Sequence, residues 1–491
     1  MNPHPQTRHV VAHELHDLAA SQLALGHRLA LVSAHEDHRG LRVVYLFTGG
    51  PPDERHEFEL HLDRAHPAVP TLADLSFAAS RFERALHDDY AIVPVGHPFL
   101  RPLVRHQHWP EDWYPMRPGA GPMPPRRVLG DPYPFTEVKG TGVYEIPVGP
   151  VHAGLIEPGH FRFSVVGETI LKMTARLWFV HRGVERLFVG LDADEGVAIA
   201  QRISGDSAVA HSLAYCLAVE DARGIEADEE SRRLRAIVLE LERLYNHVGD
   251  VGALCNDVSY AVANARAMVV RERILRLNEG VTGHRLGRGA VFVGRTSLRV
   301  LPTGRELDEV AEAFEDVVDL ALGNSVVVDR FVGTATLSRN DALAIGTLGV
   351  VARASGVAQD ARVAHPFVAG GFTPVVQEGG DVMARFVQRV EEFRASLDIV
   401  RRLSGEVRSL SGGSLRRRDP SAAGVGIVEG WRGAVVHRVE LDAQGRVARA
   451  RTLDPSFFNW PALSIALSDT IVPDFPLSNK SFNLSYAGND L

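Results

Sequence analysis

The chain has 491 residues and a net charge of −8, with 45% hydrophobic and 23% charged residues, which is ordinary composition for a globular protein. This length allows two to four domains. The acidic balance gives no support to a nucleic-acid partner, which would favour a basic face. The two cysteines, Cys216 and Cys255, form no CxxC pair. A disulfide framework and a cysteine-held zinc or iron–sulfur cluster within this chain are therefore excluded.

The sequence carries no membrane signal of its own. The first 21 residues are polar and lack the apolar core of a signal peptide. No apolar run approaches the roughly 20 residues that a membrane-spanning helix needs. We therefore expect a cytoplasmic chain, and peripheral docking on a membrane complex stays open.

Residues 1–115 predict a small α/β domain. β-rich runs cover residues 28–33 and 41–48, and residues 57–62 alternate as a third strand would. Thr71 to Asp74 resembles a capping box, which predicts a helix over residues 71–84.

A stretch rich in Pro, Gly and Arg follows, and it is too dense in proline for a helix or a central strand. We assign residues 116–137 to a linker and residues 138–491 to a second domain. Short strands are predicted at residues 142–148 and 161–166. Beyond them, apolar residues recur at helical spacing in three stretches, which are 234–248, 307–322 and 386–403. The predicted fold class is α+β, with the small N-terminal α/β domain joined to a mainly α-helical domain that carries small β-sheets.

Three stretches carry a resemblance to a known family. The first comprises residues 82–88, 96–103 and Trp109, and it is similar to the signature of the C subunit of complex I. The second comprises residues 149–161 and 180–187. It resembles the D subunit of complex I and, more closely, the large subunit of formate hydrogenlyase-type hydrogenases.

The third stretch is the C-terminus, residues 474–491, which is also typical of that group. The resemblance covers nearly the whole chain, with a C-like domain at residues 1–115 and a D-like domain at residues 138–491. The sequence is therefore identified as a member of the complex I C/D fusions that resemble the large subunits of group 4 membrane-bound [NiFe] hydrogenases.

The resemblance implies a place in a larger assembly. In this family the large subunit packs on a small subunit, which is similar to the B subunit of complex I and holds a [4Fe-4S] cluster. Both sit on antiporter-like membrane subunits at the inner face of the cell membrane. Electron transfer in the peripheral part is coupled to ion translocation in the membrane part.

The family motifs lack their metal ligands in this chain. Nickel and iron are held there by four thiolates in two CxxC pairs, because soft deprotonated sulfur suits these metals. The corresponding positions here are Ser204, Ser207, Ser456 and Asn459. We therefore predict no NiFe centre, no other metal or cofactor bound by this chain, and no hydrogenase activity.

Other residues of the family site are present. Glu157 matches a glutamate that moves protons near the metal, and Arg432 matches the arginine beside the diatomic ligands of the metal. Trp431 stands at a proline position and could fill space that the metal leaves. His152 could match a histidine that protonates quinone in the D subunit, while the quinone tyrosine position is Gly205. A structural role for Glu157 and for His152 is the alternative.

Two residues match positions near the cluster of the small subunit. Arg182 corresponds to an arginine beside that cluster in complex I, and His247 to a histidine whose protonation is linked to its reduction. A histidine suits this task because its pKa lies near neutrality. Ordinary hydrogen bonding on a helix is the alternative for both.

The leading hypothesis is a subunit of a hydrogenase-related, energy-converting oxidoreductase complex without its own NiFe centre. The alternatives are an NADH–quinone oxidoreductase-type subunit with an altered quinone site, and a non-redox scaffold of such a complex. NAD(P)H would bind another subunit, because Gly424-Val425-Gly426 lacks the rest of a dinucleotide fingerprint. The electron donor, the acceptor, the ion and the subunit stoichiometry are not encoded in any motif found here.

Overall fold

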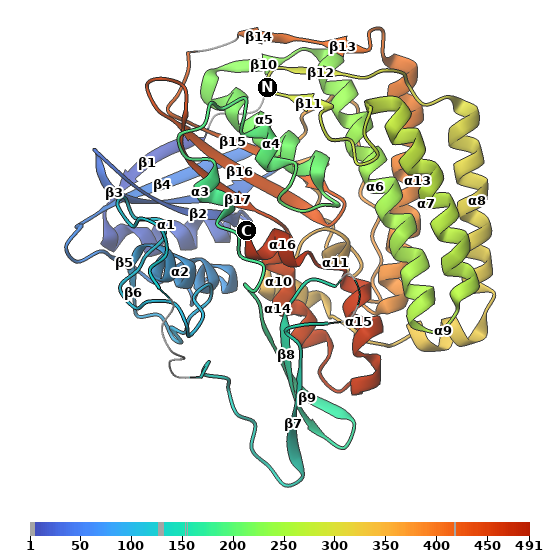
Figure 1. Ribbon diagram of the computed structural model, residues 1–491, viewed down its shortest axis with the longest axis horizontal. Helices are drawn as coiled ribbons and strands as arrows, with labels where there is room; N and C mark the ends of the chain where they lie inside the picture. Colours follow the sequence, from blue (N-terminus) through green and yellow to red (C-terminus); the bar gives the residue numbers. More distant parts are fainter. Residues whose placement is uncertain (1–4, 126–131, 153, 155, 417–418) are drawn as a thin grey trace.

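A computed structural model describes residues 5–125, 132–152, 154, 156–416 and 419–491. Its N-terminal part is a four-stranded sheet with the strand order β1-β4-β3-β2, in which β1 runs parallel to β4 and the other pairs are antiparallel. Two helices and a short parallel pair, β5 with β6, complete this part (Figure 1). The elements are β1 (Gln6–Val10), α1 (Ala12–Ala24), β2 (Arg28–Asp37), β3 (Gly40–Gly49), β4 (Glu54–Leu62), β5 (Ala68–Pro70), α2 (Phe77–Tyr90) and β6 (Val93–Val95).

The three strands predicted in this part are confirmed, but the predicted start of the helix is wrong. Helix α2 begins at Phe77 and not at Thr71. Glu83, in the second turn of the helix, accepts hydrogen bonds from the Thr71 hydroxyl and from the Leu72 backbone N–H, both at 2.6 Å. These bonds hold the approach to the helix as a turn beside it, and the helix ends only where Ala91 adopts a left-handed conformation.

The next segment has the irregular backbone that its proline content predicts. The described residues 116–125 and 132–137 contain neither helix nor strand, and residues 126–131 lie outside the described part. An antiparallel three-stranded sheet follows and extends away from the body (Figure 1). It consists of β7 (Val143–Val148), β8 (His160–Val166) and β9 (Thr169–Arg176). The first two strands match the predicted ones, and the third was not predicted.

The middle of the chain is helical, as the periodicity predicts. The long helices α6 (Glu229–Asp257) and α13 (Val382–Glu406) pack side by side, with α7 (Ala261–Thr282) and α8 (Gly304–Leu322) outside them. Elements around this bundle are α3 (Val184–Leu187), α4 (Val197–Ala200), α5 (Ala208–Arg223), β10 (Ile225–Ala227), β11 (Val291–Phe292), β12 (Arg295–Ser297), α9 (Ser325–Phe331), α10 (Arg339–Ile345), α11 (Gly349–Arg353), α12 (Ala361–Ala364), β13 (Ser411–Gly412) and β14 (Ser414–Arg416).

An antiparallel sheet near the C-terminus lies between the N-terminal part and the bundle. It is formed by β15 (Ala423–Gly430), β16 (Gly433–Leu441) and β17 (Val447–Leu453). Helix α5 packs directly on β15, and glycines make this approach possible. A Cβ at Gly426 would lie 1.9 Å from the Ala214 carbonyl oxygen, and one at Gly424 would lie 2.2 Å from that of Ala218. The two glycines of Gly424-Val425-Gly426 therefore serve helix packing.

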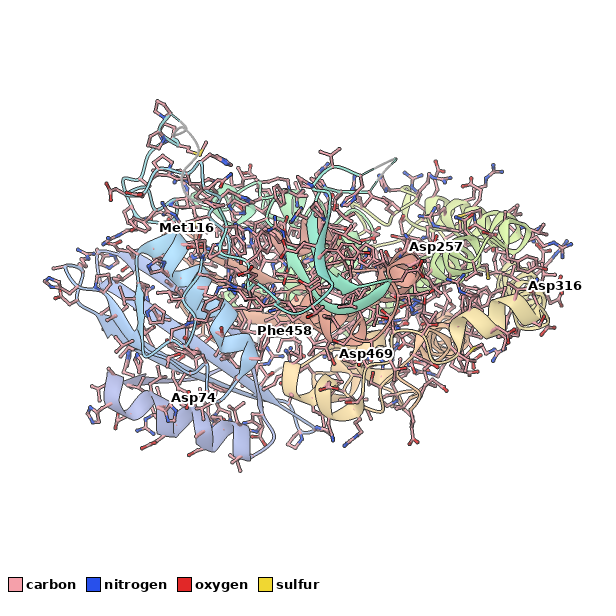
Figure 2. The ribbon with its side chains drawn as sticks, turned by 90° about the horizontal axis from the view of Figure 1, so that it is seen from below. Asp74, Met116, Asp257, Asp316, Phe458 and Asp469 are labelled. Atoms are coloured by element: carbon pink, nitrogen blue, oxygen red, sulfur yellow. The ribbon has the colours of Figure 1, made fainter. Side chains whose placement is uncertain are left out.

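Four short helices end the chain, which are α14 (Ser456–Ala466), η1 (Val472–Asp474), α15 (Phe475–Phe482) and α16 (Tyr486–Asp490). The chain as a whole is a mixed α+β protein with two apolar cores. One core lies within the helical bundle and around α5. The other runs from the N-terminal sheet through β8 and β9 to α14. Figure 2 shows this order, with Asp74 at one end, Asp316 at the other and Phe458 of α14 between them.

Buried arginines of the C-terminal sheet tie it to the N-terminal part. Arg438 donates to Glu57 at 2.8 Å and to Glu440 at 2.5 Å, and all three side chains are nearly fully buried. Arg451 donates to the Val32 carbonyl at 3.0 Å. Because a charge removed from water must be paired, these contacts fix how the N-terminal part sits on the sheet.

We expect Arg438→Met to lower the free energy of unfolding by about 3–5 kcal/mol, because Glu57 loses its cation while staying buried. Arg394→Met is the matched control, since Arg394 pairs with Glu315 at the surface, where 43% and 39% of the side chains are exposed. An exposed pair is worth below about 1 kcal/mol. Urea unfolding of the full chain measures both, and equal midpoints for the two variants would contradict this role of Arg438.

Candidate functional site

The first degenerate CxxC motif, with Ser204 and Ser207, forms the turn before helix α5. The second begins after β17 and continues into α14, where Ser456 and Asn459 lie. Both contain substituted ligand positions that are buried and hydrogen-bonded. Ser485 joins the two motifs. Its hydroxyl lies 2.8 Å from the Ser204 hydroxyl, and its backbone N–H donates to the Ser456 hydroxyl at 2.9 Å.

The other substituted positions also have partners within the chain. Asn459 binds the backbone of Leu348 twice, since its amide oxygen accepts from the Leu348 N–H at 2.8 Å and its amide nitrogen donates to the Leu348 carbonyl at 3.1 Å. Ser207 precedes α5, and Arg432 lies 3.4 Å from its hydroxyl. Hydroxyl and amide groups are hard donors, and these are already engaged. The donor set therefore does not fit a nickel–iron centre, which needs bridging thiolates.

The site contains a bidentate ion pair that the motifs alone did not predict. Asp206 lies between the two serines of the first motif and accepts two parallel hydrogen bonds from Arg432, at 2.7 and 2.6 Å. Such a bidentate pair is the strongest form of a charged hydrogen bond. The Arg432 side chain is 5% exposed and that of Asp206 36%. Burial by itself raises the pKa of Asp206, but the charge and hydrogen bonds of Arg432 outweigh it and lower the pKa below its usual value.

Trp431 completes this arrangement. Its indole N–H donates to the Asp206 carbonyl at 2.9 Å, and the Arg432 guanidinium lies 3.9 Å from the centroid of its ring. Asn246 donates to the same carbonyl at 2.8 Å. The large ring is 2% exposed and fills space next to the first motif. A carboxylate, a guanidinium and an indole thus contact one another beside the first motif.

Glu157 and His152 lie on the connection between β7 and β8. Glu157 accepts from the Ala487 backbone N–H at 3.0 Å, and His152 lies 2.8 Å from the Gly159 carbonyl through its Nε2. Within the described part of the chain, neither side chain hydrogen-bonds to Arg432. The structure thus brings Glu157 to the C-terminal segment, and it gives His152 a contact inside its own loop.

Arg182 donates hydrogen bonds to the turn that contains the first motif. Its guanidinium donates to the Ile203 carbonyl at 2.7 Å, and its backbone N–H donates to the Leu491 carbonyl at 2.6 Å. The side chain remains exposed. Arg182 therefore links the motif turn to the end of the chain and still faces outward.

His247 lies on α6 and is fully buried, with its Nε2 3.2 Å from Glu392. Burial lowers the pKa of His247 below its usual value, although Glu392 acts in the opposite direction. The ring is 6.2 Å from that of Trp431, centroid to centroid. Trp431 thus lies next to His247 and also binds the Asp206 carbonyl of the first motif.

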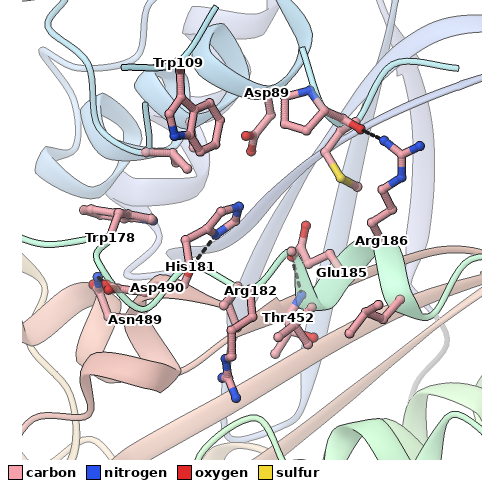
Figure 3. A pocket seen from close by; sticks show the side chains of 18 of the residues that line it. Asp89, Trp109, Trp178, His181, Arg182, Glu185, Arg186, Thr452, Asn489 and Asp490 are labelled. Atoms are coloured by element: carbon pink, nitrogen blue, oxygen red, sulfur yellow. Dashed lines mark hydrogen bonds between the residues drawn. The ribbon is translucent and has the colours of Figure 1, made fainter. Parts of the chain in front are cut away.

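A cavity of about 850 Å³ lies beside these motifs, between the N-terminal part and the C-terminal segment. Figure 3 shows Trp109 and Asp89 on one side of it and His181, Arg182 and Glu185 on the other. Further aromatic side chains line it, namely Trp113, Trp178 and Phe179. Burial raises the pKa of Asp89 to about 7 and that of Asp490 to about 6. The cavity therefore combines apolar walls with carboxyl groups that can hold a proton near neutral pH.

A buried chain of hydrogen bonds connects the cavity to the interior. Asp454, at the cavity wall, lies 3.1 Å from His211 Nε2, and His211 Nδ1 lies 3.1 Å from His437 Nε2. Thr452 is 3.2 Å from the other nitrogen of His437. This group was not predicted from the sequence, and the available signal was a histidine four residues beyond the second serine of the motif.

The chain matches two known protein families and several known proteins. Residues 4–121 match the family described as the 30 kDa subunit of respiratory-chain NADH dehydrogenase, and residues 257–423 match its 49 kDa subunit. Formate hydrogenlyase subunit 5 of Escherichia coli (strain K12) is 31% identical, with 88% of this chain and 78% of that protein covered. Hydrogenase-4 component G of the same organism is 32% identical, with 83% and 73% covered.

The chain belongs to this family of complex I-related hydrogenase large subunits. Its N-terminal and C-terminal parts correspond to the C and D subunits of complex I, as the sequence motifs predicted, and a C/D subunit of NADH-quinone oxidoreductase from Phocaeicola vulgatus is 29% identical, with 70% of each chain covered. The solved membrane-bound sulfane sulfur reductase, an archaeal respiratory membrane complex, has a chain of the same fold. That match has a TM-score of 0.63, 23% identity and coverage of 71% of this chain and 99% of the other.

The membrane-bound hydrogenase subunit alpha of Pyrococcus furiosus is also similar to this chain, at 27% identity with 69% of this chain and 85% of that protein covered. Within the described residues, no helix combines the length and the apolar character that crossing a membrane requires.

We expect Asp206→Asn to lower the free energy of unfolding at pH 7 by about 1–2 kcal/mol. A fully buried pair would lose about 3–5 kcal/mol, but part of the Asp206 side chain is open to water. The pKa of Asp206 is lower in the folded chain than its value of about 3.9 in the unfolded chain. Its contribution is therefore complete above about pH 4 and is lost as the pH falls through the folded value.

Urea unfolding of the wild type and the variant, from pH 7 downward, measures this difference. The control is Asp194→Asn, which breaks a surface pair with Arg223 at 2.6 Å. A difference between wild type and Asp206→Asn that stays constant below pH 4, or that equals the control, would refute the assigned role of Asp206.

Proposed function

We propose that this chain is the large subunit of a membrane-associated, energy-converting oxidoreductase complex that works without a NiFe centre in this subunit. Electron transfer in the complex passes through a [4Fe-4S] cluster held by a small partner subunit similar to the B subunit of complex I. Antiporter-like membrane subunits translocate the ion, and the chain lies at the cytoplasmic face of the membrane. NAD(P)H or quinone, where used, acts elsewhere in the complex or in the cavity described above.

The ion pair of Asp206 with Arg432 carries this proposal. In a hydrogenase the corresponding arginine faces an anionic metal centre and its diatomic ligands, as the family resemblance implies. Here the counter-charge is a carboxylate from the motif itself, with both oxygens engaged by Arg432. No thiolate stands at the four ligand positions, and the Asp206 carboxylate supplies a counter-charge for the buried guanidinium, which supports a site without a metal.

In this proposal Arg182 and His247 act on the partner cluster through their charges. Arg182 is exposed and fixed at the motif turn, where a positive charge would stabilise a reduced, more negative cluster. His247 is held neutral by burial, and reduction of a nearby cluster would raise its pKa. An electron and a proton would then arrive together. Glu157 and His152 would serve proton movement near the C-terminal segment.

The quinone-type alternative has an observation of its own in its favour. The cavity is lined by aromatic rings and by Asp89 and Asp490, whose pKa values lie near neutrality. Such a site could hold a flat, apolar head group and protonate it. This alternative does not rest on the tyrosine that serves quinone in complex I, because the corresponding position is Gly205. A scaffold without redox chemistry is the third alternative.

Purification of the complex through a tag on this chain distinguishes the three. The leading proposal predicts a co-purifying small subunit and an electron paramagnetic resonance signal of a reduced [4Fe-4S] cluster. Quinone reduction that is lost in Asp490→Asn would favour the quinone-type alternative. A complex without any iron–sulfur signal would leave only the scaffold.

In the purified complex, the reduction potential of the partner cluster should fall by about 59 mV per pH unit where one proton accompanies one electron. His247→Met should flatten this slope, because methionine takes up no proton. His66→Met is the control, since the His66 side chain is 90% exposed. Potentiometric titrations between pH 6 and pH 8 measure the slopes, and an unchanged slope in His247→Met would remove His247 from the mechanism.

A further inference from the structure

The N-terminal sheet carries a cluster of two histidines and one glutamate that the family motifs do not include. His27 directly precedes β2, Gly49 ends β3, and Glu54 begins β4, with His56 two residues further on the same strand. Gly49 pairs with Glu54 and Thr48 pairs with Arg28, so the row continues from Glu54 through Gly49 to His27. Because side chains alternate along a strand, Glu54 and His56 lie on one face of the sheet.

Because residue 49 is a glycine, the His27 and Glu54 side chains can approach each other. A Cβ at this position would lie 2.2 Å from Cδ2 of His27 and 2.6 Å from its Nε2. Any other residue would push the imidazole away from β4. With glycine in the middle strand, the His27 ring crosses it, and only 9% of the His27 side chain is exposed.

The two imidazoles present nitrogen atoms to one carboxylate oxygen. Nε2 of His27 lies 3.3 Å and Nε2 of His56 lies 3.5 Å from Oε2 of Glu54. One ligand atom from each residue lies within 4.8 Å of the other two. A tetrahedral cation with bond lengths of about 2.0–2.1 Å holds neighbouring ligand atoms about 3.3 Å apart. The two nitrogen–oxygen distances therefore suit a bound divalent cation.

Hydrogen bonding fixes which nitrogen of His27 faces this point. Nδ1 of His27 lies 2.7 Å from the amide oxygen of Gln22, which only accepts. Nδ1 therefore carries the proton, and Nε2 of the neutral ring points its lone pair at the Glu54 carboxylate. A cation between Nε2 of His27 and the Glu54 carboxylate would bind both of these groups. Ligand histidines of metal sites are usually oriented by a hydrogen bond of this kind.

A second cluster on the same sheet is less suited to a cation. His9, Glu59 and His61 also lie close together, but 74% of the His9 side chain is exposed. In addition, Nε of Arg42 lies 3.6 Å from the Glu59 carboxylate. This guanidinium charge opposes the binding of a second cation at Glu59.

We propose that His27, Glu54 and His56 form a binding site for a divalent transition cation of the class that prefers imidazole, such as Zn²⁺. Two imidazoles and one carboxylate are a common set of three ligands for this ion, and a water molecule would complete the tetrahedron. The bound ion would join β2 to β4 across β3 and bring the end of α1 to the sheet through Gln22. The site lies outside the two motifs and does not depend on the function proposed above. A cation bound here would contradict the expectation from the sequence that this chain binds no metal of its own.

The test is a Zn²⁺ titration of the full chain after dialysis against a chelator, followed by calorimetry or by competition with a coloured chelator. We expect one site in the wild type. His56→Gln should abolish it, and because 25% of the His56 side chain is exposed, a folding defect is a minor concern, which circular dichroism checks. Gln22→Leu, which removes only the orienting hydrogen bond, should weaken binding about 10–100-fold.

His61→Gln is the matched control, because it lies on the same strand in the second cluster and should leave Zn²⁺ affinity unchanged. Co²⁺ in place of Zn²⁺ should give the visible absorption bands of a four-coordinate ion in the wild type and in His61→Gln, but not in His56→Gln. The proposal is overturned if the wild type binds no Zn²⁺. It is equally overturned if His61→Gln abolishes binding while His56→Gln retains it.

Discussion

The pairing of Asp206 with Arg432 is the interaction around which the candidate site is organised. Arg432 is almost fully buried, and a guanidinium in that position requires a counter-charge. The Asp206 carboxylate provides it from the turn before α5. Carbonyl groups of the same turn accept hydrogen bonds from Trp431, Asn246 and Arg182. The position of this turn therefore depends on this ion pair together with the hydrogen bonds to its carbonyl groups.

The substituted positions all take part in contacts within the chain. Removal of four thiolates alone would leave an unpaired cation, which destabilises a folded protein. In this chain a carboxylate pairs with Arg432, and the Trp431 indole packs beside the first motif. The serine hydroxyls bind side chains or a backbone N–H, and the Asn459 amide binds the backbone of Leu348.

The sequence predicted the family, the fold class and the long helices, because these depend on motifs and on a periodicity that is local in the chain. It did not predict the start of α2. Glu83 accepts a hydrogen bond from the Thr71 hydroxyl, and sequence rules for helix capping do not include a contact over this distance along the chain. The role of Asp206 was missed for a similar reason. A carboxylate within a turn is usually a solvated residue, and its partner is 226 positions away. The His211–His437 contact likewise depends on how α5 crosses β16.

We infer that the pairing of Asp206 with Arg432 takes the place of the metal that the family resemblance implies. Elemental analysis of the purified complex, together with an assay of hydrogen uptake and evolution, tests this inference. We predict nickel far below one equivalent per large subunit and no turnover of hydrogen in either direction. Nickel near one equivalent, with hydrogen uptake, would contradict it.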